Sequence, residues 1–198
     1  MSVTEHRSRN IAVITGASSG IGAIYADRLA ARGYDLVLVA RRADRLQTLA
    51  ASLTAKHGVQ VTPLVADLAT TAGQDSVADV LANNPAVSVL VNNAGLARLA
   101  PLAASTPDDV SSQLALNITA LTRLTYAVLP ALKQRNAGLI INVASVLGLH
   151  SLPISAVYSG TKSFVVAFTR GIEQELADTG VKVQAVLPAA TATELWDP

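Results

Sequence analysis

The stretch TGASSGIG, residues 15–22, decides the fold of this chain. It directly follows a continuous apolar run that begins at Ile11, and it precedes a segment of helical character. Its three glycines, Gly16, Gly20 and Gly22, permit a tight turn and let backbone N–H groups approach a phosphate closely. A strand, a glycine-rich loop and a helix in this order indicate a dinucleotide site; the alternative is a plain turn with a glycine kept for packing.

Outward from this loop, short apolar runs alternate with helical stretches along the chain. Runs without polar alternation are typical of strands that are buried on both faces. The alternation predicts right-handed crossovers and an α/β fold: a doubly wound, mostly parallel, Rossmann-like sheet with helices on both faces. Because no linker or repeat interrupts it, residues 1–198 are predicted to form a single domain. The apolar runs begin at Ile11, Tyr34, Val59, Val87, Gly138 and Val181, and the expected helices cover 21–32, 44–57, 70–83, 107–136 and 156–179.

Composition narrows the class of protein. Of the 198 residues, 51% are hydrophobic and 15% are charged, which is enough apolar surface for a large core. The net charge of +1 gives no reason to expect a nucleic-acid partner. The chain has no cysteine and its histidines lack metal-ligand spacing, so no metal is predicted. The first ten residues lack an apolar signal region and the apolar run 137–149 is short for a bilayer, so we expect a cytoplasmic protein without a membrane partner.

Four later features accompany the glycine loop. They are NNAG at 92–95, Asn117 inside an apolar helical stretch, Ser145 after an apolar strand, and Tyr158 four positions before Lys162. With the loop spacing G-x-x-x-G-x-G, their order and spacing resemble the short-chain dehydrogenase/reductase family over nearly the whole chain. The resemblance implies an NAD(P)-dependent oxidoreductase that transfers a hydride between nicotinamide and a carbonyl or secondary alcohol.

Tyr158 and Lys162 are the centre of the predicted chemistry. Their spacing places both side chains on one face of a helix. A free tyrosine titrates near pH 10, and a cation one turn away favours the phenolate, so we expect a lowered pKa and proton exchange with a substrate oxygen. The alternative is an ordinary helix-surface pair. By the resemblance, Ser145 bonds the reacting oxygen, Lys162 also contacts the nicotinamide ribose, and Asn117 holds a water that links Lys162 to solvent.

Arg41 and Arg42 end the second expected strand, where a carboxylate would bind the ribose 2′-hydroxyl of NAD. Two guanidiniums suit a 2′-phosphate, so we predict NADP(H) in preference to NAD(H); a solvated pair of arginines is the alternative. The resemblance extends the cofactor contacts over several strand ends. The predicted set is Gly16, Ser18, Ser19, Gly20, Ile21, Gly22, Arg41, Arg42, Asp67, Leu68, Asn93, Ala94, Gly95, Tyr158, Lys162, Pro188 and Thr191.

The last part of the sequence departs from the family pattern. Ala189 stands where the family usually has glycine, which leaves the assignment of Thr191 open. Family members also continue with a substrate-covering segment, a strand and a helix, and we expect the last strand and helix to be lacking here. The apolar helices 107–136 and 156–179 predict a homodimer or homotetramer. The alternative functions are a dinucleotide-binding sensor or scaffold, and a lyase or epimerase that uses the cofactor transiently.

Overall fold

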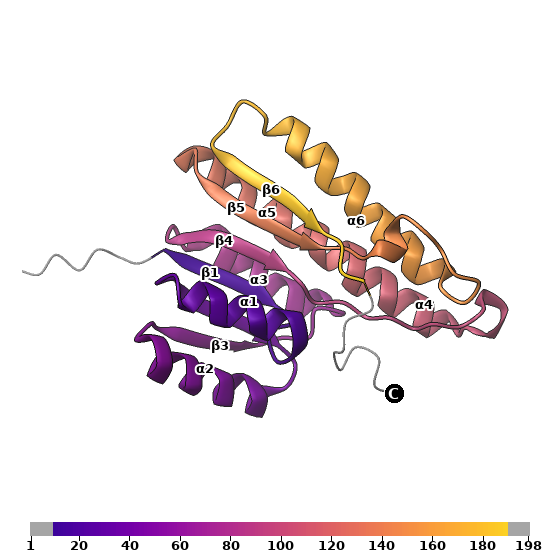
Figure 1. Ribbon diagram of the computed structural model, residues 1–198, viewed down its shortest axis with the longest axis horizontal. Coiled ribbons are helices and arrows are strands. Elements are labelled where there is room, and N and C mark those ends of the chain that lie inside the picture. Colours follow the sequence, from indigo (N-terminus) through magenta and orange to yellow (C-terminus); the bar gives the residue numbers. More distant parts are fainter. Residues whose placement is uncertain (1–9, 190–198) are drawn as a thin grey trace, which may run out of the picture.

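A parallel sheet forms the centre of the computed structural model, which describes residues 10–189 (Figure 1). Over that range six strands follow the order β3-β2-β1-β4-β5-β6. From β1 the chain first adds strands on one side and then, from β4 on, on the other, so the strand order reverses between β1 and β4. Such a switch point opens a crevice outside the carboxyl ends of the strands. The strands are β1 (Ile11–Thr15), β2 (Asp35–Ala40), β3 (Val61–Val65), β4 (Val87–Asn92), β5 (Gly138–Val143) and β6 (Val181–Val186).

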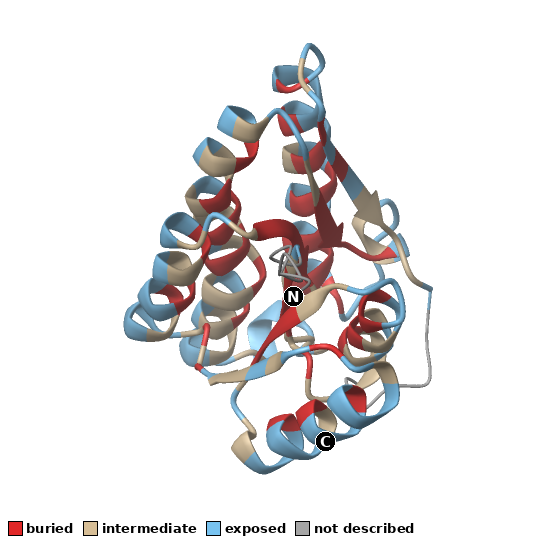
Figure 2. Cartoon of the chain, turned by 90° about the vertical axis from the view of Figure 1, so that its left-hand side faces the viewer, coloured by how far each residue is buried: buried red, intermediate tan, exposed pale blue. Residues whose placement is uncertain are grey.

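Helices cover both faces of the sheet, which confirms the predicted doubly wound class. α1 (Gly20–Ala30) and α2 (Ala43–His57) pack on one face. α3 (Thr71–Asn83), α5 (Leu121–Arg135) and α6 (Ala156–Glu175) pack on the other. Figure 2 shows the buried residues on the strands and on the inward sides of these helices.

The helix expected over 107–136 is not uniform. α4 (Pro107–Leu114) leads into α5 through a π turn, Ala115–Ala120, which contains Asn117. Two short 3-10 turns, Leu102–Ala104 and Val146–Gly148, lie in the connections after β4 and β5. π turns within helices are often found at functional sites.

Alternate residues of each central strand serve two different cores. In β1, Ala12 and Ile14 belong to the cluster under α1 and α2, whereas Val13 belongs to the cluster under α3 and α5. Both clusters need apolar side chains, so the strand reads as an unbroken apolar run. Full burial of a side chain the size of Val13 or Ile14 contributes about 1.5–3 kcal/mol relative to exposure.

The two outer strands depart from the expectation of burial on both faces. Along β6, Val181 and Val183 are buried while Lys182 and Gln184 are exposed. β3 contains Pro63, which lacks an N–H for a sheet ladder and is tolerated at an edge. Within residues 10–189 each of these strands has a single neighbour, so one of its hydrogen-bonding edges is unpaired.

The helical run Pro107–Arg135, of 29 residues, is long and apolar enough to cross a membrane by composition alone, with a mean hydropathy of 1.2 over an 18-residue window. A core helix in a globular domain has the same properties, so this is weak evidence. Gln113, Asn117 and Thr125 of this run are buried and hydrogen-bond to other parts of the domain. These bonds attach one side of the run to the rest of the domain, while 33% of its apolar window is buried, and the absence of a membrane partner stays a prediction.

Candidate active site

The glycine loop has no room for side chains at its key positions. Gly16 and Gly20 have φ of +65° and +56°, a region that disfavours residues with a Cβ. A Cβ on Gly22 would stand 2.3 Å from the carbonyl oxygen of Gly16. The N-cap of α1, Ser19, makes no side-chain capping bond, so the first-turn N–H groups are not capped by a side chain. This loop can bring its backbone against a phosphate.

The segment after β4 is hydrogen-bonded to the glycine loop and to the residue before it. The Asn93 amide donates to the carbonyl oxygens of Thr15 and Gly16, at 2.9 and 3.1 Å. The Thr15 hydroxyl accepts from the backbone N–H groups of Asn93 and Ala94, both at 3.0 Å. The glycine loop and the NNAG segment are thus one rigid unit at the switch point.

A cleft of about 410 Å³ opens at the carboxyl edge of the sheet. Most of the predicted cofactor residues line it, namely Gly16, Ser18, Ser19, Gly20, Ile21, Arg41, Arg42, Asp67, Leu68, Asn93, Ala94, Gly95, Tyr158, Lys162 and Pro188. Gly22, Asn117 and Ser145 are not among its lining residues, and Thr191 lies outside the described range. The sequence did not predict a further set of lining residues, which are Val39, Ala40, Ala66, Leu96, Ala97, Arg98, Leu116, Val143 and Ala144.

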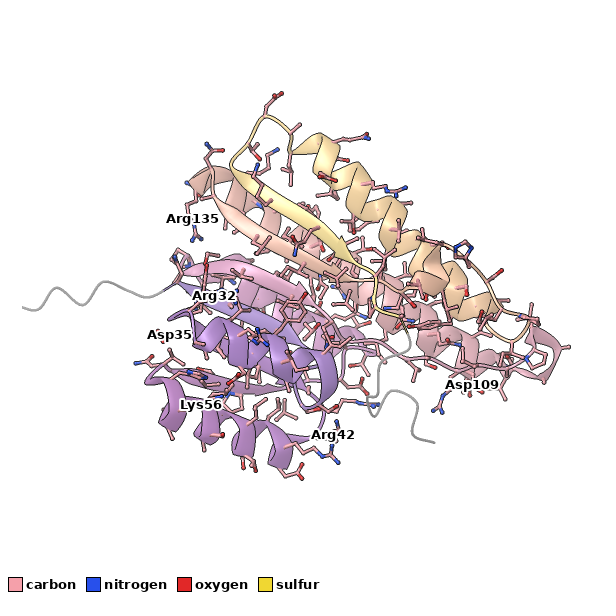
Figure 3. The ribbon with its side chains drawn as sticks, viewed as in Figure 1. Arg32, Asp35, Arg42, Lys56, Asp109 and Arg135 are labelled. Carbon is pink, nitrogen blue, oxygen red and sulfur yellow. The ribbon has the colours of Figure 1, made fainter. Side chains whose placement is uncertain are left out.

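One end of the cleft is positively charged. Arg42, labelled in Figure 3, donates through Nη2 to the hydroxyls of Ser18 and Ser19, each at 2.9 Å. Arg41 beside it is exposed. A guanidinium fixed on the hydroxyls of the glycine loop can donate to a phosphate group in the same place.

The wall formed by Asp67 and Leu68 is supported by a residue that the sequence did not single out. Gln74 of α3 is buried and donates to the carbonyl oxygen of Leu68 at 2.9 Å. Its own oxygen accepts from Arg123 of α5 at 2.9 Å, and Arg123 also bonds Asp75. A glutamine in an amphipathic helix gives no sequence signal of such a role.

Tyr158 and Lys162 lie in the first turns of α6, and both are buried, with 4% and 5% of their surface exposed. The Lys162 ammonium donates to the carbonyl oxygen of Val143 at 2.8 Å and stands 5.7 Å from the centre of the Tyr158 ring. Burial lowers the pKa of Lys162 from 10.5 to about 8. The pair is not an ordinary surface contact, since both members are enclosed at the cleft.

The expected direction of the Tyr158 pKa is wrong for this arrangement. Burial raises the pKa of the phenol above its usual 10.0, and a hydrogen bond with the Ser145 side chain opposes the rise. Lys162 is committed to Val143 and faces the ring, so desolvation prevails over its attraction for a phenolate. Ser145, 7% exposed and just beyond the end of β5, nonetheless lies close enough to Tyr158 to affect the pKa of its phenol.

Asn117 joins three segments around the Tyr158–Lys162 pair. Its amide accepts from Leu96 N–H at 2.8 Å, donates to Leu96 O at 2.9 Å, and donates to the Thr161 hydroxyl at 3.0 Å. A Cβ on Gly95 would stand 3.5 Å from both Asn117 Oδ1 and Lys162 Nζ. The side chain of Asn117 therefore fixes the segment after NNAG, and its predicted hold on a water stays a prediction.

A switch-point cleft with a glycine cradle, beside a buried phenol–ammonium pair, defines a class: Rossmann-type proteins that bind a dinucleotide next to a proton-transferring tyrosine. Comparison with known proteins makes the class specific. The sequence profile of the family described as short chain dehydrogenase matches residues 10–198. The chain belongs to this family.

Individual relatives agree with the family. The very-long-chain 3-oxoacyl-CoA reductase-B of Danio rerio is 35% identical over 188 residues, which are 93% of this chain and 60% of the relative. A short-chain dehydrogenase from Sphingobium yanoikuyae, solved in complex with NADPH, has a TM-score of 0.92 and 45% identity and covers 94% of this chain and 73% of its own. A bulky-bulky ketone specific alcohol dehydrogenase from Comamonas testosteroni has a TM-score of 0.90 and 39% identity, and the match covers 92% of this chain and 74% of the dehydrogenase. This chain thus spans 60% of the length of the Danio rerio reductase.

Proposed function

We propose that the protein is an NADP(H)-dependent oxidoreductase that interconverts a carbonyl compound and a secondary alcohol. The observation that carries the proposal is the placement of Tyr158 and Lys162 in the wall of the same cleft as the glycine loop. A sensor or scaffold would have no need to bury an ammonium beside a phenol. This is a reason to prefer the enzyme over the binding module.

The residues of the cleft fit a dinucleotide phosphate. Gly16 and Gly22 let the loop pack closely on itself and on the NNAG segment, since a Cβ on either would approach backbone or amide atoms within 2.9 Å. A loop this tight can present its backbone N–H groups to a phosphate. Arg42 is held on the loop hydroxyls at the end where a 2′-phosphate would add two negative charges. The similar structure from Sphingobium yanoikuyae was solved with NADPH, which supports the same choice of cofactor here.

A bound nicotinamide would supply the hydride in reduction and accept it in oxidation. In the reductive direction the Tyr158 hydroxyl donates its proton to the substrate oxygen, as a general acid. The Ser145 hydroxyl, which is near enough to lower the pKa of that phenol, bonds the substrate oxygen as well. Below pH 8, Lys162 is protonated, and its charge stabilises the phenolate that remains.

Isotope transfer tests this proposal. The protein is mixed with NADPH deuterated at the transferable position and with a panel of aryl and alkyl ketones, and the alcohol product is analysed by mass spectrometry. We expect deuterium on the carbinol carbon and weaker activity with NADH. Alcohol formation without deuterium, or no consumption of reduced cofactor with any ketone, would contradict the proposal.

A further inference from the structure

A third arginine, Arg98, lies in the wall of the cleft but outside the cluster formed by Arg41 and Arg42. Arg42 follows β2, whereas Arg98 follows β4, and β1 lies between these two strands in the sheet. Figure 3 labels Arg42 and Asp109, the ion-pair partner of Arg98, at well separated places. A cofactor whose 2′-phosphate is at Arg42 leaves Arg98 without an assigned role.

The backbone around Arg98 is fixed by two buried amides. Gln113, 1% exposed, accepts from the N–H of Arg98 at 3.1 Å. Asn117, also 1% exposed, bonds both backbone groups of Leu96. The main chain at Leu96 and Arg98 is therefore tied to two buried side chains.

The guanidinium itself is only loosely paired. Its Nε stands 3.6 Å from Asp109 Oδ1, and its side chain is 58% exposed. The other carboxylate oxygen of Asp109 accepts from the Thr106 hydroxyl at 2.8 Å, so this acid is shared with the cap of α4. A guanidinium has five N–H donors in a planar fork, and a single long contact leaves most of them for a ligand.

Apolar side chains share the cleft wall with Arg98. Leu96, Ala97 and Leu116 line the same cleft. A wall that combines these side chains with an exposed guanidinium is complementary to an apolar molecule that ends in a negative charge.

We propose that Arg98 is a specificity-determining residue that binds an anionic group of the substrate, a carboxylate or a phosphate carried by a largely apolar carbonyl compound. This rests on the proposed oxidoreductase function, because the carbonyl must reach Tyr158 in the same cleft. The anion forms charge-assisted hydrogen bonds with the guanidinium fork and displaces the loose contact with Asp109. Neutral ketones of the same shape are still reduced, but less efficiently.

Matched substrates test the proposal. Keto acids from 4-oxopentanoate to 7-oxooctanoate are compared with their methyl esters and with keto phosphates of similar length, by kcat/KM with NADPH. The wild type should prefer one anionic series, and Arg98→Ala should reduce that preference by about tenfold, as expected for one partly exposed charged contact. The preference should also weaken with added salt. The acid and phosphate series identify which anion is bound.

Two variants and one binding measurement separate the possible outcomes. Arg32→Ala, which removes an exposed arginine whose contact is with Arg28 O, should leave the preference unchanged, and Asp109→Asn should increase it. The affinity for NADPH, measured by calorimetry, should be the same in Arg98→Ala as in the wild type. Reduction of the esters without any preference for anions overturns the Arg98 proposal alone, as does a loss of NADPH affinity in Arg98→Ala with the preference kept. If no member of the panel is reduced, the proposed function is overturned as well.

Discussion

Lys162→Met should stabilise the protein at neutral pH while it abolishes activity. Burial lowers the pKa of this lysine from 10.5 to about 8, so at pH 7 the folded protein keeps a charge that it would hold more easily when unfolded. At 1.36 kcal/mol per pKa unit, that shift amounts to about 3 kcal/mol. Methionine removes the penalty but leaves the Val143 carbonyl oxygen without its donor, which costs about 1 kcal/mol. The net expectation is a gain of about 2 kcal/mol.

The pH dependence gives the same reasoning an independent test. Between pH 8 and 10.5 the unfolded chain keeps the lysine proton and the folded chain does not, so the stability of the wild type rises with pH in this window. Tyr158 has a raised pKa and contributes in the opposite direction only above pH 10.0. Below that pH the lysine effect is therefore separate, and the advantage of Lys162→Met should shrink steadily as pH increases from 8.

Urea unfolding at several pH values from 7 to just below 10, on wild type and variant, measures both effects. Lys162→Arg is the matched control, because it keeps a buried cation and should gain no stability. A Lys162→Met protein that is less stable than the wild type at pH 7, or a wild-type stability that does not change across this range, would refute the assigned burial cost.

Three further predictions concern the cofactor cleft and are measured by calorimetry, the first two with NADPH and NADH and the third with two fragments of the cofactor. Gly22→Ala should weaken the binding of both cofactors and destabilise the fold by about 1–3 kcal/mol, because its Cβ would stand 2.3 Å from Gly16 O. Unchanged affinity would contradict the assignment of this loop to the cofactor phosphates. The double variant Arg41→Ala, Arg42→Ala should lose roughly 10–100-fold in NADPH affinity with little change for NADH, and equal losses would show that the arginines do not read the 2′-phosphate. Gln74→Met should weaken the binding of 2′,5′-ADP by about tenfold, because its bond to Leu68 O is lost, yet leave the binding of nicotinamide mononucleotide unaffected. Equal effects on the affinity of both fragments would indicate a general loss of structure.

The architecture was predictable because the strongest signals are local. The unbroken apolar runs and the TGASSGIG loop specify strands, a turn and a helix without knowledge of distant contacts. The sequence indicated Asn117 as an unusual residue in an apolar helix, but it did not predict the π turn. The bonds of Asn117 to Leu96 and Thr161 depend on segments far away in the sequence. The exposure of one side of β6 has a local signal in the alternation of Val181, Lys182, Val183 and Gln184, whereas its place at the edge of the described sheet depends on strand order.

The site divides in the same way. Most of the residues that line the cleft follow strand ends, and the sequence locates strand ends well. Gln74 and Arg98 escaped notice because their importance comes from what lies behind or beside them: the Leu68 carbonyl in one case and the Gln113 amide in the other. The pKa of Tyr158 is raised, where the sequence predicted a lowered pKa, for a similar reason. Sequence spacing shows that Lys162 is near, but not that its ammonium is bonded to Val143 while the phenol is buried.

Proton donation by Tyr158 is the central claim, and single-turnover kinetics of Tyr158→Phe test it most directly. The substitution removes one oxygen, keeps the buried ring and should leave NADPH affinity unchanged. With any ketone that the wild type reduces, oxidation of enzyme-bound NADPH should slow by the factor of about 10²–10⁴ that accompanies loss of a general acid. A Tyr158→Phe protein that binds NADPH normally and turns over bound ketone at nearly the wild-type rate would remove Tyr158 from the mechanism.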